Sequence, residues 1–437
     1  IHSYKDLGSE RPEGIALAAI TKRKFAHDVL LVKKDTAGQI AKMKEFVVGT
    51  SSPRRIVNIE KNLADFLPNP DLAVSTKVLR GNINTRIKKL QNNDYHAIVL
   101  ALAGVERLAT HPESRKELNG LLDGLTFMIL PQSIFTSAAS QGALGIECLD
   151  GRDDGGELKE KLAKLSDEVT MEEMSVERKL FAHYGGGCHL AVGINALKVN
   201  GCMVVNQNGS VDDREIVSKE ISGLNYELPA AKKLFIGLPA DDHKSTDSKI
   251  VYDSLISKKS IDCGVDFSNK NLYVTSRHCL ASIAKGSAQK TTWSAGVETW
   301  KRLAKQGEWV HGTADSLGEE RIAELINSQA LNLITPLDSS EWFVLSNETA
   351  KSELGRVITV YDRVVDSNDG IGPSLESVDI FYWTSFYQYQ TYVERFPFIK
   401  DRPHCCGFGK SYQQFKQHAI EVTPFISILS FKKTVNA

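Results

Sequence analysis

Apolar and polar positions in the first part of the chain alternate between short continuous apolar runs and stretches of helical spacing. Continuous runs at residues 46–49 and 97–103 have the length of buried strands, and residues 72–79 are predicted to form a third strand between them. Between the first two runs, apolar side chains recur on one face of a helix: Ile56, Ile59, Leu63 and Phe66. Another helix is expected at residues 85–90. This order predicts a parallel sheet whose ligands bind where strands pass into helices.

Farther along, the pattern changes to a small α+β unit and then to a second α/β region. A helix is predicted at residues 171–181, and strands with Asn-Gly turns follow from residue 191 to about 222. A junction is expected at residues 230–233. The strands predicted beyond it lie at 234–238, 271–275, 291–295, 342–345, 357–361 and 379–383, with helices at 298–305 and 319–327.

The composition is that of a globular protein. Apolar residues make up 42% and charged residues 24% of the 437 residues, which excludes bulk disorder. No apolar run reaches the roughly 18 residues of a membrane helix, so no membrane partner is predicted. Seven cysteines and the absence of a signal-type N-terminus favour a reducing cytoplasm over a disulfide framework. The first residue is Ile1 and not Met, which predicts a fragment or a trimmed or processed chain.

The net charge of −1 conceals an asymmetry between the two ends. Residues 1–117 contain 20 Lys+Arg against 13 Asp+Glu, a balance of +7, so the remainder carries −8. A basic N-terminal part suits an anionic ligand. The basic residues are scattered, few aromatics lie among them, and no nucleic-acid-binding motif is present. A small polycarboxylate or a phosphate is therefore expected, and nucleic acid is not.

Two arginine pairs are candidates for anion binding. Arg54 and Arg55 follow Ser51-Ser52-Pro53, which marks the start of the predicted helix. Free N–H groups, the helix dipole and two guanidiniums would converge there, although a solvated first turn is the alternative. Arg80 and Arg86 lie on one turn and on the helix that follows it, and the alternative here is a plain surface turn.

A glycine run precedes one cysteine. Gly185-Gly186-Gly187 frees the backbone beside Cys188 from Cβ clashes, so a bulky group could approach the thiol closely. A cysteine exposed in such a loop could be a nucleophile or an attachment point. The alternative is a small buried residue next to a turn.

Two other signals carry no expected function. His404-Cys405-Cys406 has no second ligand pair at zinc spacing, so no metal is predicted. Gly407-x-Gly409-Lys410-Ser411 lacks the first glycine of a phosphate-binding loop, so no nucleotide is predicted.

Five motifs occur in order across residues 1–222, and together they resemble porphobilinogen deaminase, also called hydroxymethylbilane synthase. The motifs are His2-Ser3-Tyr4-Lys5-Asp6, Gly49-Thr50-Ser51-Ser52-Pro53-Arg54-Arg55, Leu79-Arg80-Gly81-Asn82-Ile83-Asn84-Thr85-Arg86, Gln141-Gly142-Ala143-Leu144-Gly145-Ile146-Glu147 and Gly186-Gly187-Cys188. In the family a segment holding most of the first domain precedes the first motif. The first lobe of this chain is therefore expected to be incomplete.

The resemblance implies a covalent cofactor and a catalytic carboxylate. Cys188 would hold a dipyrromethane by a thioether, and four porphobilinogen units would be added to it with loss of ammonia. Asp6 would stabilise the cationic azafulvene of each condensation. The residues expected to bind the acetate and propionate groups of cofactor and substrate are Lys5, Arg54, Arg55, Arg80 and Arg86, with Ser51, Ser52 and Gln141 as further substrate-binding positions.

The second half is similar to uroporphyrinogen-III synthase. The segments that carry this resemblance are Leu272-Tyr273-Val274-Thr275-Ser276-Arg277, Trp293-Ser294-Ala295-Gly296-Val297-Glu298-Thr299, Val357-Ile358-Thr359-Val360-Tyr361-Asp362-Arg363, Phe381-Tyr382-Trp383-Thr384-Ser385 and Cys406-Gly407-Phe408-Gly409. The resemblance implies that Tyr361 assists loss of the terminal hydroxyl of hydroxymethylbilane. A packing role for Tyr361 is the alternative. Ser276, Thr299 and Ser385 would bind carboxylates or, alternatively, cap helices.

The expected protein is an α/β multidomain monomer of the cytoplasm that makes hydroxymethylbilane and closes it to uroporphyrinogen III. The implied deaminase half has two α/β lobes like those of periplasmic binding proteins and a small α+β domain, and two synthase-type α/β lobes follow. In the deaminase half, residues 1–21 with 129–165 are expected to form the remnant of the first domain, 22–128 the second domain and 166–229 the third domain with the cofactor cysteine. In the synthase half, residues 234–262 with 364–437 are expected to form the first lobe and 265–361 the second lobe. A hinge is expected near residues 262–264 and 361–364. The alternatives are a deaminase with a degenerate C-terminal interaction module, or a non-catalytic two-lobe anion-binding protein.

Overall fold

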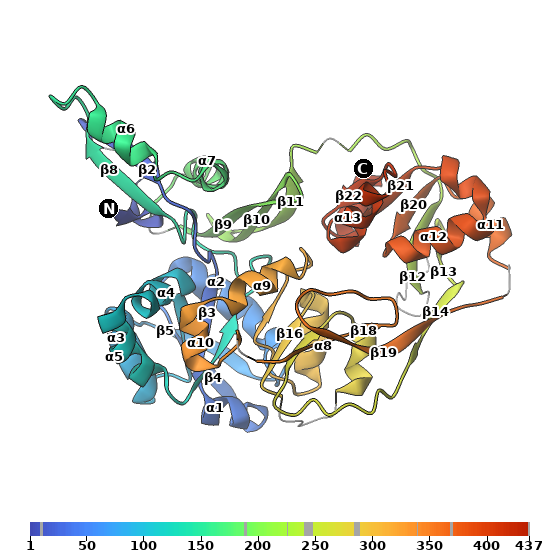
Figure 1. Cartoon of the computed structure of the whole chain (residues 1–437), viewed down its shortest axis with the longest axis horizontal. Coiled ribbons are helices and arrows are strands. Elements are labelled where there is room, and N and C mark those ends of the chain that lie inside the picture. The colour runs from blue at the N-terminus through green and yellow to red at the C-terminus, as the bar shows by residue number, and fades with distance from the viewer. Residues whose placement is uncertain are drawn as a thin grey trace.

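The computed structural model describes residues 1–8, 12–187, 190–224, 226–239, 248–283, 289–338, 340–367 and 370–435. Within these residues the chain forms five sheets with helices between them, which confirms the predicted α/β multidomain class (Figure 1). None of the helices in these ranges is long and apolar enough to cross a membrane.

The first α/β unit contains a five-stranded sheet in the order β5-β4-β6-β3-β7. Strand β4 pairs in parallel with β5 and β6, as the sequence pattern predicts, whereas β3 runs antiparallel to both β6 and β7. The strands are β3 (Asp28–Lys33), β4 (Glu45–Gly49), β5 (Ala73–Lys77), β6 (Ala97–Ala101) and β7 (Leu125–Ile129). The helices are α1 (Lys34–Gln39), α2 (Pro53–Asn62), α3 (Ile83–Gln91), α4 (Leu102–Thr110) and α5 (Pro112–Leu122), with short turns η2 (Ile40–Lys42) and η3 (Leu63–Phe66).

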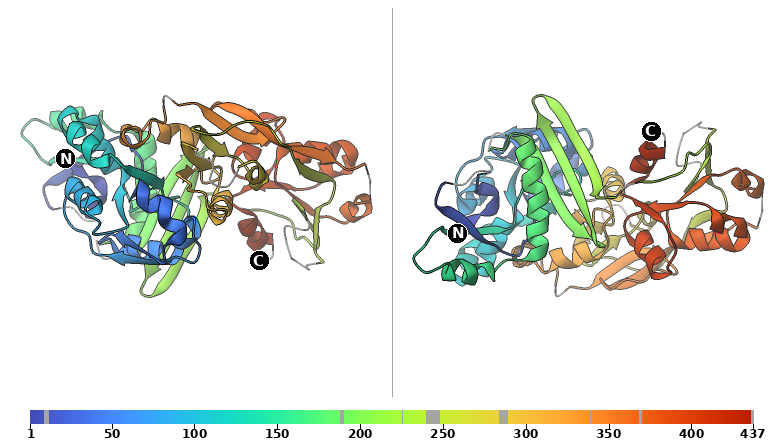
Figure 2. Two further views of the ribbon diagram at one scale, coloured as in Figure 1. Left: turned by 90° about the horizontal axis from the view of Figure 1, so that it is seen from below. Right: turned by 90° about the horizontal axis from the view of Figure 1, so that it is seen from above.

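Two smaller sheets complete the first half. The sheet β1-β8-β2 is antiparallel and consists of β1 (His2–Ser3), β2 (Ile15–Ile20) and β8 (Leu144–Leu149), with the turn η1 (Tyr4–Asp6) directly after β1. The helices α6 (Glu157–Ala163) and α7 (Glu168–His183) follow. An antiparallel meander of β9 (Ala191–Val199), β10 (Cys202–Val211) and β11 (Arg214–Ser222) comes next, and α7 lies along it (Figure 2).

The second half contains two sheets. The chain forms β12 (Leu234–Pro239) and β13 (Ile250–Asp253) of a parallel five-stranded sheet, which later gains β20 (Ile380–Trp383), β21 (His404–Gly407) and β22 (Thr423–Phe425). In between it builds a six-stranded sheet from β14 (Ile256–Ser260), β15 (Asn271–Val274), β16 (Thr291–Ser294), β17 (Gly312–Thr313), β18 (Trp342–Asn347) and β19 (Arg356–Val365). The intervening helices are η5 (Arg277–Ser282), α8 (Val297–Lys305), α9 (Glu320–Ile326), α10 (Gln329–Ile334), α11 (Gly372–Glu376), α12 (Phe386–Arg395), η6 (Pro397–Asp401), α13 (Lys410–Gln417) and α14 (Ile428–Val435).

An antiparallel strand pair connects these two sheets. Strand β14 pairs with the C-terminal part of β19, so that Ser260 lies opposite Tyr361 and Ile256 opposite Val365. The pair therefore involves residues 256–260, a few positions before the 262–264 segment expected from sequence. The domain boundaries as a whole stay predictions.

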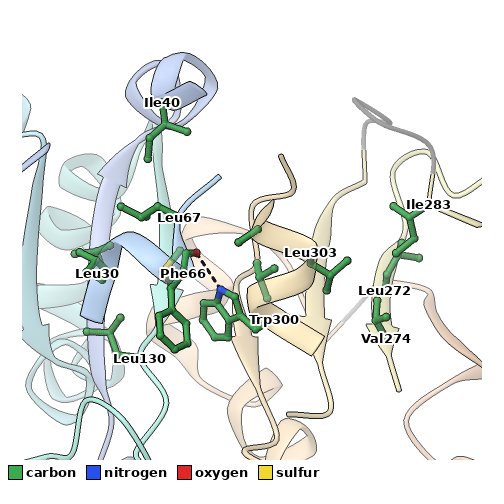
Figure 3. Packing of buried hydrophobic residues seen from close by; sticks show 14 of the residues in the cluster. Leu30, Ile40, Phe66, Leu67, Leu130, Leu272, Val274, Ile283, Trp300 and Leu303 are labelled. Atoms are coloured by element: carbon green, nitrogen blue, oxygen red, sulfur yellow. Dashed lines mark hydrogen bonds between the residues drawn. The ribbon is translucent and has the colours of Figure 1, made fainter. Parts of the chain in front are cut away.

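The two halves of the chain share a hydrophobic core, which the sequence did not indicate. Phe66 and Leu67 of the first half lie in one cluster with Trp300 and Leu303 of helix α8 (Figure 3). The rings of Phe66 and Trp300 meet edge to face with centroids 5.4 Å apart. Because these side chains are fully buried, each half covers apolar surface that the other would otherwise expose to water.

Polar contacts join the two halves as well. Edge strand β7 lies beside edge strand β17, and the Ile129 N–H donates to the carbonyl of His311 at 2.7 Å. The buried carboxylate of Glu106 accepts the Ser328 hydroxyl at 2.7 Å and the Ala330 N–H at 3.0 Å, where α10 begins. These bonds satisfy groups that would be costly to bury alone, so the halves pack as one body.

Candidate active sites

The first candidate site is built around a buried carboxylate, Asp28. This residue opens β3 and is fully buried. Arg55 binds it bidentately, with Nε at 3.0 Å from one oxygen and Nη2 at 2.7 Å from the other. Arg54 Nη2 donates to it at 2.9 Å, and Gln141 Nε2 donates at 2.9 Å. Two guanidiniums thus enclose one carboxylate in charge-assisted hydrogen bonds.

Helix α2 positions the two arginines because its first turn carries both of them and faces the sheet. Burial by itself would raise the pKa of Asp28, but the charges of Arg54 and Arg55 outweigh it and hold that pKa far below the usual range. Arg54 Nη1 also donates to the Thr136 carbonyl at 2.6 Å, and Arg55 Nη1 to the Val99 carbonyl at 3.1 Å. The alternative of a solvated first turn is therefore wrong: both arginines are buried and bind a carboxylate of the chain itself.

Lys5 lies next to this cluster. Its ammonium is 3.4 Å from Gln141 Oε1. Burial, and after it the positive charge of Arg55, lower the pKa of Lys5 to about 8, although the negative charges of Asp28 and Asp6 act in the opposite direction. The lysine is thus a cation whose proton is held more weakly than in water.

Asp6 ends the same turn, and its side chain is exposed. Arg107 on α4 lies near it: burial lowers the pKa of Arg107, and the negative charge of Asp6 raises it. Arg107 Nη1 also donates to the Ser3 hydroxyl at 3.1 Å. The exposed carboxylate of Asp6 therefore lies within electrostatic reach of two cations, Lys5 and Arg107.

The remaining predicted residues of this half lie in adjoining loops. The Ser51 hydroxyl donates to the Leu79 carbonyl at 2.7 Å and so ties the start of α2 to the loop that carries Arg80. Arg80 itself is exposed. Burial and the charge of Arg55 lower the pKa of Arg86, which places Arg86 within electrostatic reach of the cluster. Ser52 is the N-cap residue of α2, but its hydroxyl makes no capping bond.

The glycine run follows α7. Gly185, Gly186 and Gly187 have φ values of +90°, +62° and +109°, a conformation that side chains with a Cβ rarely adopt. Cys188, together with His189, lies outside the described residues. The position of the thiol relative to the Asp28 cluster stays a prediction.

Arg23 links helix α7 to the Asp28 cluster. Its Nε donates to the Gln141 carbonyl at 3.0 Å, and its Nη1 to the buried Glu177 of α7 at 2.8 Å. Glu177 also accepts the Ala196 N–H of β9 at 2.7 Å. The helix that leads into the glycine run is therefore fixed to the residue that holds Asp28 and Lys5.

The second candidate site is a cavity of about 630 Å³ between the two sheets of the second half. Its lining includes all four residues predicted for this half, which are Ser276, Thr299, Tyr361 and Ser385. Ser276 Oγ accepts the His278 N–H at 3.3 Å and Ser385 Oγ accepts the Gln388 N–H at 3.2 Å. Both serines therefore cap helical turns and line the cavity at the same time.

Tyr361 is almost fully buried at the cavity wall. Its hydroxyl accepts a hydrogen bond from Asn347 Nδ2 at 3.3 Å, and burial raises its pKa. Its ring lies 5.6 Å from the imidazole of His278. The phenol is thus neutral, fixed in direction and adjacent to space that a ligand could fill.

Comparisons with known proteins bear on the first half. The family model described as "Porphobilinogen deaminase, dipyromethane cofactor binding domain" matches residues 1–157. The porphobilinogen deaminase of Campylobacter jejuni is 38% identical over 196 residues, which are 45% of this chain and 56% of that protein. That of Prochlorococcus marinus is 33% identical over 238 residues, which are 54% of this chain and 68% of that protein.

The chain belongs to the porphobilinogen deaminase family. It spans about half the length of the Campylobacter relative. A solved uroporphyrinogen-III synthetase of Helicobacter pylori shares 13% identity, with a TM-score of 0.32 over 47% of this chain and 99% of that one.

Sequence reasoning missed two charged residues of the deaminase-type site, Asp28 and Arg107. Asp28 directly precedes the apolar run of β3, and a carboxylate at the edge of a buried strand is the signal that could have revealed it. Arg107 carries no such signal, because nothing local to α4 indicates that the helix approaches Asp6. Four basic residues that line the second cavity were also not predicted from the sequence: Lys258, Arg277, Arg302 and Arg363.

Proposed function

We propose that the first half is a hydroxymethylbilane synthase, which joins four porphobilinogen molecules head to tail with loss of ammonia. We also propose that the protein is a monomer of the cytoplasm. The observation that carries the proposal is the arrangement of Lys5 and Asp6 beside the buried Arg54–Asp28–Arg55 cluster. Porphobilinogen bears two carboxylates and forms a cation when it loses ammonia. A site for it needs fixed positive charge and one accessible carboxylate.

The residues present fit a dipyrromethane cofactor, which also carries carboxylate groups. Lys5, Arg54, Arg55 and Arg86 are the cations placed to interact with those groups, Arg80 adds an exposed guanidinium, and Ser51, Ser52 and Gln141 supply further polar contacts. Cys188 is the residue proposed to carry the cofactor by a thioether. When bound, the cofactor supplies the pyrrole end to which new units are attached.

The chain's own residues have separate roles in this proposal. Asp28 fixes the two buried guanidiniums in one direction, so that their remaining N–H groups bind carboxylates without reorganisation. Lys5 contributes a second kind of charge, a compact ammonium. Asp6 is the exposed carboxylate that would stabilise positive charge as it develops on a pyrrole ring.

The test is the intact mass of the protein isolated from cells. We expect the mass to exceed the polypeptide mass by a dipyrromethane, and Cys188→Ser to lose both this adduct and porphobilinogen consumption. Cys148→Ser, a matched control in the same half, should keep both. Asp6→Ala should keep the adduct and stop chain growth. Linear tetrapyrrole made by Cys188→Ser protein would refute the assignment.

We propose that the second half closes hydroxymethylbilane to uroporphyrinogen III. Tyr361, Ser276, Thr299 and Ser385 all line one cavity between two lobes, and this supports the proposal. The neutral phenol of Tyr361 could donate a proton to the departing hydroxyl. The serines and the threonine would hold carboxylates, so that the tetrapyrrole is kept in a conformation that can cyclise.

The second activity is tested by supplying hydroxymethylbilane to the whole protein and identifying the isomer formed. We expect uroporphyrinogen III, in which the last ring is inverted. Formation of the uninverted isomer I alone, which arises without an enzyme, would mean that this half is a non-catalytic module.

A further inference from the structure

Three basic side chains of the second cavity come from three different elements and meet around one histidine. Lys258 lies on β14, Arg277 on η5 and Arg302 on α8, and all three line the cavity. His278 lies among them: burial first, and then the positive charges of these three residues, lower its pKa to about 4. Arg277 Nε is 3.4 Å from His278 Nε2.

Two acidic residues, Asp253 and Glu298, also line the cavity. Asp253 already accepts the Leu255 N–H at 2.9 Å and the Tyr392 hydroxyl at 2.5 Å. Glu298 is exposed on the first turn of α8. Across the described part of the chain, neither Lys258 nor Arg302 takes part in an ion pair.

The strand pair between the lobes adds a repulsive contact. Lys258 lies directly opposite Arg363 across β14 and β19. Like charges in facing positions of an antiparallel pair are destabilising. Arg363 donates to Asn347 Oδ1 at 2.8 Å, forms an ion pair with Glu348 at 3.3 Å, and lies over the ring of Tyr387. Lys258 itself lies over the ring of Tyr361, 5.9 Å from the ring centroid, and is attracted by the charge of Asp253. Because no ion pair within the described residues includes Lys258, its ammonium is able to attract an anion in the cavity.

We propose that Lys258, Arg277 and Arg302 form a recognition site for the carboxylates of a polycarboxylate tetrapyrrole. That the ligand is a tetrapyrrole rests on the proposed synthase function. That the site binds carboxylates rests on the three basic side chains. Guanidiniums bind carboxylates with parallel hydrogen bonds, and such bonds strengthen when the site is partly shielded from water. The cavity volume lies within the range of sites for small organic ligands.

The experiment measures binding of two stable porphyrins to the whole protein by fluorescence. Uroporphyrin III carries eight carboxylates and coproporphyrin III carries four on the same ring. Uroporphyrin III should bind more tightly, and added salt should weaken its binding more. Arg302→Gln and Lys258→Gln should each raise its dissociation constant about 10- to 100-fold, as expected for the loss of a charged hydrogen bond. Lys305→Gln, on the same helix but outside the cavity lining, should stay within about twofold.

The outcomes separate this site from the proposed reaction. Unchanged uroporphyrin binding in Arg302→Gln and Lys258→Gln protein would overturn the recognition site, whatever isomer the enzyme makes. If the unaltered protein makes only isomer I but binds uroporphyrin through these charges, the synthase function fails and the anion site stands. Arg302→Lys tests the geometry: it should bind more weakly than the unaltered protein and more tightly than Arg302→Gln, because lysine keeps the charge but loses the bidentate contact. Equal binding by the Lys and Gln variants would contradict the proposal.

Discussion

The indole N–H of Trp300 donates a 3.0 Å hydrogen bond to the carbonyl oxygen of Phe66, 234 positions earlier in the chain. The two side chains also pack edge to face inside a cluster that draws on both halves (Figure 3). This bond connects η3, the turn after α2, with α8, the helix that carries Arg302. The first turn of α2 carries Arg54 and Arg55. The two candidate active sites are built on elements that share a core.

The first prediction concerns this shared core. Trp300→Ala should destabilise the protein by about 3–5 kcal/mol, because it removes a fully buried aromatic side chain. Trp300→Phe should cost less, since it keeps an aromatic ring and loses only the bond to the Phe66 carbonyl. Urea titration monitored by fluorescence and circular dichroism provides the measurement. If the first half keeps its stability in Trp300→Ala protein, the halves are independent.

The second prediction concerns the buried carboxylate. Asp28→Asn should cost about 3–5 kcal/mol, because it leaves two buried guanidiniums without a counter-charge. The exposed Asp71→Asn serves as a control and should change the free energy of unfolding by at most about 0.5 kcal/mol.

The pH dependence of the same variant follows from the lowered pKa of Asp28. The stabilisation by its carboxylate is fully present above the ordinary aspartate pKa of about 3.9 and is lost as the pH falls toward the folded-state value. The difference in stability between the unaltered protein and Asp28→Asn should therefore be constant near neutral pH and shrink below about pH 4. A difference that grows on acidification would contradict the ion cluster.

The third prediction uses Lys5. Because its pKa is about 8, the lysine should bind carboxylates well at neutral pH and lose its charge as the pH rises through 8. The Michaelis constant for porphobilinogen should rise over this interval. Lys5→Arg should remove the rise, since a guanidinium stays protonated there. An identical pH profile in Lys5→Arg protein would exclude Lys5 as its cause.

The fourth prediction separates chemistry from folding at Tyr361. Tyr361→Phe should slow ring closure about 100-fold if the phenol donates a proton. It should change the free energy of unfolding by about 1 kcal/mol or less, because Asn347 keeps a contact to Ser346 and the ring stays in place. Tyr412→Phe, a control outside the cavity lining, should leave the rate unchanged. A large loss of stability with an unchanged rate would support the packing role.

Local sequence patterns predicted the positions of several strands well. The apolar run at 46–49 lies in β4 and the run at 234–238 lies in β12, whereas the run at 97–103 covers β6 and the first two residues of α4. Short motifs also pointed to the deaminase family, because each of them is a contiguous run of residues. This success has a physical cause: periodicity along the chain reports which face of a helix or strand is buried, and that information is local.

Only the tertiary structure decided what covers each buried face and which charges meet. The sequence identified Arg54 and Arg55 as an anion site, but their partner Asp28 depends on β3 lying antiparallel beside β6, an order that periodicity does not encode. Likewise, Lys258 and Arg302 gather around one cavity only because two lobes fold against each other. Local patterns determine burial, whereas the partners of a buried charge or an apolar face are set by contacts between residues far apart in sequence, because these form only when the sheets assemble.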